Sequence, residues 1–278
     1  MGIIGITGGK GGTGKSTVAT SLAYALSNQG QKVLLVDADV DCPNDHLLLG
    51  IELKEIEKVN QRIPEFNPDK CIKCGGCGKV CKTNAIVSIK DKVPIFIKEQ
   101  CNGCGSCKII CDSDAISFTE KEIGKIFIGK KDGLDFLSGE LKPNEPISEF
   151  VVNKLNELIE EKKEGYDYII IDTAAGTHCP VIAALEMCDK IFAVTEPTPL
   201  GHHDLQIILE LLKMMKKESN IVINRSDIGN AKLIENLSKE YGSKIVAEIP
   251  YSKEIVDSYS NAKPIVHREI DKIMGMIR

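Results

Sequence analysis

The sequence predicts an α/β protein with a mostly parallel sheet flanked by helices, and three observations support this. A short apolar run at residues 2–7 leads into a glycine-rich loop and then into apolar residues at helical spacing. Further short apolar runs, at 32–36 and 166–171, each end in an aspartate. Between these runs lies a segment of different composition that holds eight of the 11 cysteines. Continuous apolar runs separated by helices are typical of parallel strands buried on both faces.

The glycine-rich loop fits the pattern G-x-x-x-x-G-K-[ST] from Gly9 to Ser16, between a strand and a helix. Its glycines let successive backbone N–H groups turn toward one anion, and the helix adds its positive end. We expect Lys15 to reach the β and γ phosphates of a triphosphate and the Ser16 hydroxyl to bind Mg²⁺. The alternative, a turn that binds nothing, fits the full match and its flanks poorly. The predicted nucleotide-binding residues here are Gly9, Lys10, Gly11, Gly12, Thr13, Gly14, Lys15, Ser16 and Thr17.

Lys10 is a second lysine inside this loop and has no role in an ordinary phosphate loop. The resulting pattern K-G-G-x-G-K-[ST] resembles the deviant phosphate loop of the MinD, ParA, Mrp and nitrogenase iron protein ATPases. The resemblance implies that Lys10 reaches across a dimer interface to the nucleotide of the other subunit, and that the active form is an ATP-dependent homodimer. A solvated surface lysine is the alternative.

Acidic residues follow two of the predicted strands, where the carboxyl ends of parallel strands lie beside a phosphate loop. The segment after residues 32–36 resembles the V-D-x-D switch of the same family. This implies that Asp37 lies near the Mg²⁺ and that Asp39 orients the attacking water. For Asp37 and Asp39, an acidic turn that only caps a helix is the alternative. Asp172 matches a Walker B aspartate and would hold Mg²⁺ through water. The residues assigned to catalysis are Lys10, Lys15 and Asp39, and those assigned to Mg²⁺ are Ser16, Asp37 and Asp172.

Asn224 and Arg225 follow the apolar run 221–223 and resemble the family segment whose asparagine reads the adenine edge. An asparagine amide offers both a donor and an acceptor, which suits the amino group and ring nitrogen of adenine. We expect both residues to bind nucleotide, with the loop 250–251 packed on the base. An Asx turn at Asn224 is the alternative.

The eight clustered cysteines form two runs of C-x₂-C-x₂-C-x₃-C, and each cysteine of the second run lies 30 positions after its counterpart. This spacing is typical of a bacterial-type ferredoxin, in which the fourth cysteine of each run ligates the other cluster. Structural zinc is the alternative, but zinc sites usually separate two cysteine pairs by a longer spacer. The prediction assigns Cys71, Cys74, Cys77 and Cys111 to one [4Fe–4S] cluster, and Cys101, Cys104, Cys107 and Cys81 to the other.

Nucleotide-binding motifs lie on both sides of the cysteine runs, so the cysteine-rich segment is predicted to be an insertion. We expect a first part of a P-loop ATPase domain at 1–60, an inserted α+β ferredoxin-like domain at 61–120, and the second part of the ATPase domain at 121–278.

Three cysteines lie outside the runs. Cys179 follows Asp172 by seven positions, where the nitrogenase iron protein carries a cluster cysteine. Three interpretations remain open for it: a transient metal or cluster ligand shared with the partner subunit, a redox-active thiol, or a small buried side chain. Cys42 and Cys188 are predicted to be buried structural residues.

The net charge of −5 argues against nucleic acid as a partner. The chain contains no long uncharged apolar run and begins directly in a strand, so we expect a cytoplasmic protein without stable membrane insertion. The amphipathic run 265–277 is predicted to be a helix packed on the domain.

Together these features predict an ATP-hydrolysing iron–sulfur protein with ATP or ADP, Mg²⁺ and two [4Fe–4S] clusters as cofactors. In the first hypothesis a nucleotide-switched dimer couples ATP to electron transfer toward a redox partner. The alternative is a carrier or maturation ATPase that delivers clusters to a client protein. A MinD-like positioning scaffold would leave the cysteine runs unexplained.

Overall fold

The computed structural model describes residues 1–263 and 265–277. Within them, nine strands form one sheet in the order β11-β10-β9-β1-β8-β2-β7-β6-β3. The seven strands from β11 to β7 are parallel, and β6 and β3 are added antiparallel at one edge. The strands are β1 (Gly2–Thr7), β2 (Val33–Ala38), β3 (Lys54–Phe66), β6 (Ile116–Lys131), β7 (Leu134–Leu141), β8 (Tyr168–Thr173), β9 (Lys190–Thr195), β10 (Ser219–Asn224) and β11 (Lys244–Ile249).

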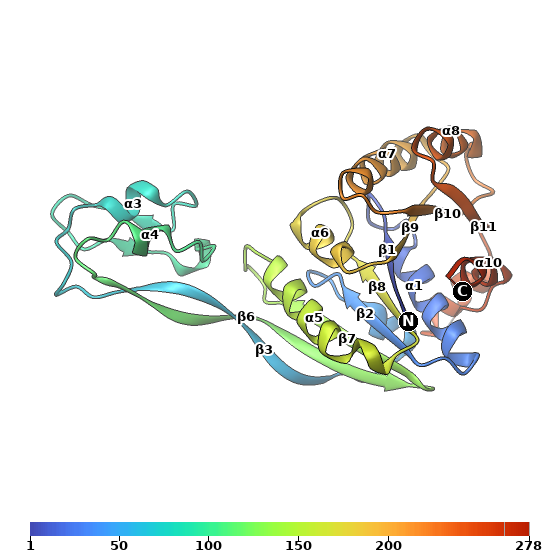
Figure 1. The fold of residues 1–278 in the computed structure, drawn as a ribbon, viewed down its shortest axis with the longest axis horizontal. Coiled ribbons are helices and arrows are strands. Elements are labelled where there is room, and N and C mark those ends of the chain that lie inside the picture. The colour runs from blue at the N-terminus through green and yellow to red at the C-terminus, as the bar shows by residue number, and fades with distance from the viewer. Residues whose placement is uncertain (264, 278) are drawn as a thin grey trace.

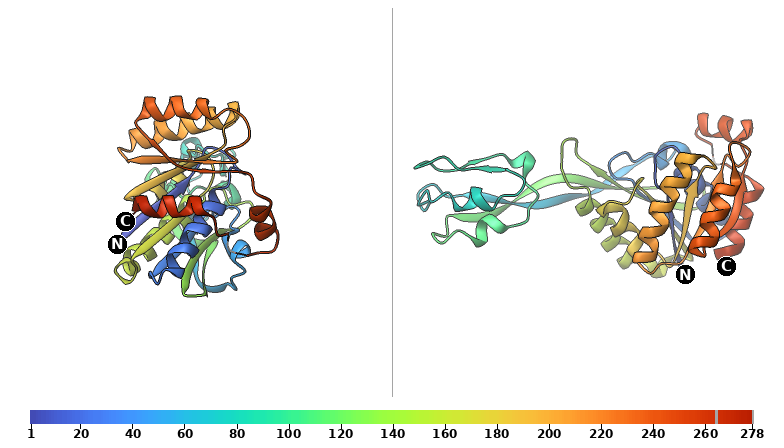
Figure 2. Two further views of the ribbon diagram at one scale, coloured as in Figure 1. Left: turned by 90° about the vertical axis from the view of Figure 1, so that its right-hand side faces the viewer. Right: turned by 90° about the horizontal axis from the view of Figure 1, so that it is seen from above.

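Helices cover both faces of the parallel part, as Figure 1 and the two views of Figure 2 show. The sheet has one hydrophobic core on each face, and successive residues of a strand point to opposite faces: Ile3 packs into one core and Ile4 into the other. One face is covered by α5 (Glu149–Lys162), α6 (Cys179–Glu186), α7 (Pro199–Met214) and α8 (Ala231–Tyr241), and the other by α1 (Lys15–Asn28), α2 (Asp45–Leu49), α9 (Lys253–Ser260) and α10 (Arg268–Ile277). The predicted α/β fold with a mostly parallel sheet is confirmed.

The two edge strands continue beyond the sheet as a long ribbon (Figure 1). β3 pairs with β6 from Lys54↔Ile128 to Phe66↔Ile116, whereas β6 pairs with β7 only from Gly124 onward. The outer half of the ribbon therefore has no further strand beside it. The predicted boundaries at 61 and 120 fall inside this ribbon.

The ribbon carries residues 67–115, which form a small separate unit at its far end (Figure 2). Its elements are α3 (Gly76–Val80), β4 (Ile86–Val87), β5 (Ile95–Phe96), a 3₁₀ turn at Lys98–Gln100 and α4 (Ser106–Ile109). The two cysteine runs repeat in backbone conformation as well as in sequence, because left-handed residues recur 30 positions apart: φ is 75° and 77° at Gly75 and Gly105, and 56° and 50° at Asn84 and Asp114.

Two elements extend beyond the apolar pattern that marks them in the sequence. Only 125–128 has the pattern of a short buried strand, but β6 spans Ile116–Lys131. The helical pattern of the next segment is clear from Asp204 onward, but α7 begins at Pro199, because the Thr198 side chain accepts a hydrogen bond from the Gly201 N–H at 3.0 Å and caps the helix there.

The C-terminal run forms α10, which packs on the domain as expected. Ile270, Ile273 and Met274 are buried against the core beside α1 and β11. Among the described residues, no helix has the length and apolar character needed to span a bilayer.

Candidate functional site

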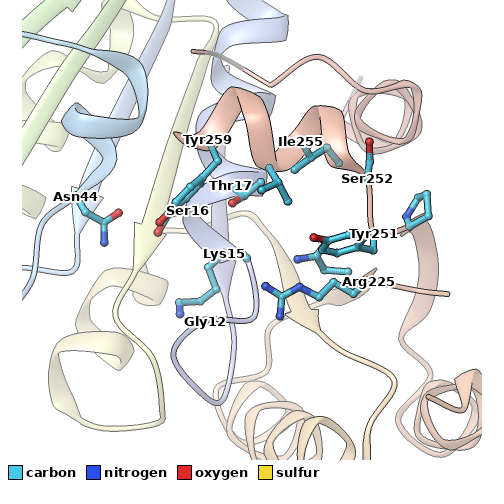
Figure 3. Close-up of a pocket in the computed structure, with 14 residues that line it drawn as sticks. Gly12, Lys15, Ser16, Thr17, Asn44, Arg225, Tyr251, Ser252, Ile255 and Tyr259 are labelled. Carbon is cyan, nitrogen blue, oxygen red and sulfur yellow. The ribbon is translucent and has the colours of Figure 1, made fainter. Parts of the chain in front are cut away.

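A pocket of about 410 Å³ opens at the carboxyl ends of the parallel strands, beside the glycine-rich loop. Figure 3 shows Lys15 and Ser16 at its centre, Arg225 beside Tyr251, and Ile255 and Tyr259 on the helix that faces the loop. The lining residues are Gly12, Gly14, Lys15, Ser16, Thr17, Asn44, Asn224, Arg225, Pro250, Tyr251, Ser252, Ile255, Val256 and Tyr259.

The loop holds its shape through left-handed glycines and one contact from β10. Gly12 and Gly14 have φ of 81° and 96°, a conformation that a Cβ disfavours. The Asn224 amide donates a hydrogen bond to the Thr13 carbonyl at 2.9 Å. Asn224 therefore supports the loop, in addition to lining the pocket in which it is predicted to read the base.

Gly14→Ala should destabilise the nucleotide-free protein more than Gly12→Ala. Both changes place an alanine at positive φ, but a Cβ at Gly14 would lie 2.3 Å from the Asn224 amide nitrogen, whereas one at Gly12 meets nothing within 4 Å. We expect the clash to add about 1–3 kcal/mol to the loss of unfolding free energy, measured by denaturant titration. Equal losses would show that Asn224 exerts no constraint on the loop.

The first residues of α1 carry the side chains that are predicted to contact phosphate and metal. Lys15 is buried, and its ammonium lies 3.4 Å from the Lys10 carbonyl oxygen, to which it donates. The Ser16 hydroxyl donates to Asp172 Oδ2 at 2.6 Å. Near its carboxyl end, strand β8 thus brings Asp172 to the helix that begins at the phosphate loop.

Asp37 is held rigidly at the end of β2. Its carboxylate accepts hydrogen bonds from the backbone N–H groups of Asp39, Asn44 and Asp45, at 3.1, 2.8 and 3.0 Å. Burial raises the pKa of both Asp37 and Asp172; the charge of Asp39 adds to the rise at Asp37, and the charge of Asp37 adds to the rise at Asp172. Such a buried acidic corner fits a hard divalent cation, because one oxygen of Asp172 has no hydrogen-bond partner among the described residues.

Asp45 joins this corner although sequence reasoning did not select it. The ligand atoms of Asp37, Asp45 and Asp172 all lie within 4.8 Å of one another, and all three residues are buried. Burial, followed by the charges of Asp172 and Asp37, raises the pKa of Asp45 well above its usual value. Its place directly after Asn44 in an acid-rich segment was the only signal in the sequence.

Asp39, the predicted water-orienting residue, is half-buried beside the same corner. Burial raises the pKa of its carboxyl, and the positive charge of Lys15 opposes that rise. The segment after β8 is tied to the phosphate loop by the Gly176 N–H, which donates to the Gly8 carbonyl at 3.1 Å. The phosphate loop therefore lies next to both Asp39 and the segment that follows Asp172.

The far side of the pocket collects the residues predicted to bind the base. Arg225 lines the pocket and donates to Glu196 Oε1 at 2.6 Å, which fixes the guanidinium. Tyr251 is 57 % exposed and free to pack on a ligand. Ile255 and Tyr259 come from α9, a helix that the sequence reading did not anticipate.

The cysteines of the first predicted set lie around one cavity in the inserted unit, where Cys111 joins Cys71, Cys74 and Cys77 across the repeat. In the second set, burial raises the pKa of the Cys101 and Cys107 thiols; Cys81 and Cys104 add to the rise at Cys101, and Cys101 and Cys104 to the rise at Cys107. None of these cysteines forms a disulfide within the described chain. Among the described residues, no three cysteine sulfurs lie within 4.8 Å of one another.

The remaining cysteines differ in exposure. Cys188 is buried, and burial raises the pKa of its thiol to about 12. Cys42 is exposed, so the prediction that it is buried is wrong: it lies in the polar loop after β2 rather than in an apolar run. Cys179 is exposed at the first turn of α6, which removes the interpretation as a small buried side chain.

A parallel sheet with a phosphate loop between its central strand and the following helix, and with acidic strand ends beside that loop, defines a P-loop nucleotide-binding protein. The chain belongs to the CbiA family, the CobQ/CobB/MinD/ParA nucleotide binding domain, which matches residues 4–265. It is a nucleotide-binding member of the MinD/ParA superfamily of P-loop ATPases.

Two relatives, similar over most of their length, support this assignment. The chain is 36 % identical over 264 residues to Uncharacterized protein MJ0579 of Methanocaldococcus jannaschii, covering 93 % of this chain and 89 % of the relative. It is 24 % identical over 271 residues to the septum site-determining protein MinD of Thermotoga maritima, covering 95 % of this chain and 80 % of that protein.

Solved structures show the same fold. The cell division ATPase MinD of Pyrococcus furiosus aligns with a TM-score of 0.61 at 22 % identity, covering 99 % of this chain and 100 % of that one. MinD of Pyrococcus horikoshii, solved with Mg-ADP, aligns with a TM-score of 0.58 at 22 % identity over 94 % and 86 % of the two chains.

Proposed function

We propose that this chain is an ATP-hydrolysing iron–sulfur protein, a nucleotide-switched homodimer that couples ATP to electron transfer through two [4Fe–4S] clusters. The observation that carries the proposal is the β3–β6 ribbon, which joins the sheet of the nucleotide pocket directly to the unit with the two cysteine runs. A continuous, hydrogen-bonded connection of this kind can transmit a change at the pocket to the cysteine-rich unit.

The nucleotide half of the proposal is supported by the residues around the phosphate loop. Lys15 binds the β and γ phosphates, Asp39 orients the attacking water, and Ser16, Asp37 and Asp172 hold Mg²⁺ directly or through water. When bound, Mg²⁺ neutralises charge that develops between the β and γ phosphates. Asn224, Arg225 and Tyr251 surround the base at the opposite end of the pocket.

The iron–sulfur half is supported by the arrangement of the cysteines. Cys71, Cys74, Cys77 and Cys111 would hold one cluster, and Cys101, Cys104, Cys107 and Cys81 the other; each cluster would supply one-electron chemistry. A single tetrahedral zinc ion, with Zn–S bonds of ~2.3 Å, would need sulfurs about 3.8 Å apart. The C-x₂-C-x₂-C-x₃-C spacing of both runs favours the larger, polynuclear group.

The coupling route runs through hydrogen-bonded neighbours. Asp37, at the end of β2, lies opposite Ser138 of β7, and the Leu141 N–H at the end of β7 donates to the Val40 carbonyl at 2.8 Å. β7 in turn pairs with β6 of the ribbon. Rearrangement of the segment 37–45 around a γ-phosphate would therefore act on the base of the ribbon.

An alternative, delivery of iron–sulfur clusters to a client protein, is favoured by the exposed thiol of Cys179. Cargo held there would lie near the nucleotide pocket and away from the inserted unit. Permanent clusters in the insert would then serve a secondary role.

Iron content and electron paramagnetic resonance, measured on anaerobically reconstituted protein with and without ATP, separate the two functions. Electron transfer predicts about eight irons per chain, unchanged in Cys179→Ser, and faster oxidation of the reduced protein by a one-electron acceptor when ATP is present. Delivery predicts additional iron that Cys179→Ser removes and that ATP releases to an apo-ferredoxin. A chain that binds zinc in place of iron would refute both.

A further inference from the structure

The buried side chain of Asp45 is unexplained by the roles assigned so far. Its backbone N–H donates to Asp37 Oδ2 at 3.0 Å, which fixes the residue at the start of α2. Both of its carboxylate oxygens are buried and have no hydrogen-bond partner among the described residues. A fully buried carboxylate with two unsatisfied oxygens is costly unless a cation or a proton satisfies it.

The unsatisfied oxygens point into a ready-made ligand set. Oxygen atoms of Asp37, Asp45 and Asp172 lie within 4.8 Å of one another, and one oxygen of Asp172 is also without a partner in the described chain. Carboxylate oxygens around one hard divalent cation lie at most about 4–5 Å apart, since the metal–oxygen bonds are ~2.0–2.6 Å long. The three side chains can therefore contact a single ion directly.

The cation would lie behind the phosphate loop rather than in the open pocket. Asp45 does not line the nucleotide pocket, whereas Ser16, which donates to Asp172, does. The carboxylates thus come from β2, β8 and α2 and close the site from the side of the sheet. Nothing in this ligand set requires a phosphate oxygen.

We propose that Asp45 is a direct ligand, with Asp37 and Asp172, of a divalent cation that binds before the nucleotide and in its absence. This inference rests on the proposed function in placing Mg²⁺ at the same corner, but it adds a ligand and an order of binding. The cation that is already bound holds α2 and the segment 37–45 in place, so that a triphosphate binds next to a complete metal site. The expected ion is Mg²⁺ or Mn²⁺, because all the ligands are oxygens.

The test measures Mn²⁺ binding to the reconstituted, iron-loaded protein without nucleotide, by the loss of the free Mn²⁺ electron paramagnetic resonance signal. We expect the wild-type chain to bind about one Mn²⁺ and Asp45→Asn to bind at least about tenfold more weakly. Asp41→Asn is the matched control, because it removes the same charge from an exposed position in the same segment. It should bind Mn²⁺ as the wild type does.

Thermal unfolding provides a second readout. In EDTA, Asp45→Asn should be more stable than the wild type, because one of three mutually repelling carboxylates is gone. Added Mn²⁺ should raise the melting temperature of the wild type and of Asp41→Asn, and should leave that of Asp45→Asn nearly unchanged.

No Mn²⁺ binding by the nucleotide-free wild type, or equal affinity in Asp45→Asn, would overturn the inference and would indicate that shared protons satisfy these carboxylates. ATP hydrolysis and iron content are measured on the same samples. A chain that hydrolyses ATP but binds no Mn²⁺ alone disproves only the inference. A chain that binds Mn²⁺ but does not hydrolyse ATP disproves only the proposed function.

Discussion

Lys10→Ala should abolish ATP hydrolysis and ATP-dependent dimerisation while ATP binding and iron content stay unchanged. A cationic side chain supplied across an interface typically accelerates phosphoryl transfer by about 10³–10⁵-fold, and we expect a loss in that range. Hydrolysis is measured as phosphate release, dimerisation by light scattering with ATP or ADP, and binding with a fluorescent nucleotide.

The structure explains why Lys10 is available for this role. Lys15 occupies the loop interior and donates to the Lys10 carbonyl, so the backbone of Lys10 supports its own site. The Lys10 ammonium makes no hydrogen bond or ion pair with any residue that the structure describes, and the side chain is half-buried. The Lys10 side chain can therefore move away from its own loop without breaking a hydrogen bond or an ion pair with a described residue.

Subunit mixing provides a control for a contact made in trans. A heterodimer of Lys10→Ala with Asp39→Asn contains one complete site, because the first subunit keeps Asp39 and receives Lys10 from the second. Mixing two inactive variants should therefore restore hydrolysis, whereas an exposed-lysine control on α8, Lys239→Ala, should be active alone. Failure of the mixture to recover, with dimers present, would place the role of Lys10 within its own subunit.

The phosphate loop and the parallel sheet could be predicted because their geometry restricts the sequence. Gly14 must be glycine, since its φ is positive and its Cβ would collide with Asn224. The strands β1 and β8 are buried on both faces and therefore appear as uninterrupted apolar runs.

The sequence did not predict the ribbon, because its strands are not continuous apolar runs. Its exposed face carries polar pairs across the strands, and on its buried side the polar Gln61 lies between Val59 and Ile63, which interrupts the apolar pattern. Lys58 pairs with Glu122 at 2.9 Å, and Asn60 donates to Glu120 at 3.0 Å. A search for buried strands finds only the inner part of β6, where the ribbon joins the sheet.

Asp45 and α9 were missed for a related reason. Asp45 is separated from Asp172 by 127 positions and meets it only when β2 and β8 pair in the sheet. Helix α9 has only 8 residues, too few for a repeated helical pattern, and none of them is buried, although Ile255 and Tyr259 line the pocket. Asp45 and α9 owe their roles to their position in the folded chain, and no local sequence pattern predicts that position.

Paired cysteine variants should reveal which thiols share a cluster. Cys71→Ala with Cys111→Ala should keep about four irons per chain, because both changes fall on one cluster. Cys71→Ala with Cys81→Ala should lose nearly all iron, because each cluster then lacks one ligand. The two double variants remove the same number of thiols, so any difference in iron content reports on ligand assignment alone.

This outcome follows from how the repeat folds. Cys111 lines the cavity of the first run with Cys71, while Cys81 packs with Cys101 of the second run beneath Ile63 and Ala85. Were each run to hold its own cluster through all four of its cysteines, the results would be reversed: the variant lacking Cys71 and Cys81 would retain iron and the one lacking Cys71 and Cys111 would not. Equal iron loss in both would show that the two halves of the insert fold as one unit that tolerates no missing ligand, since each fourth cysteine is contributed by the opposite half.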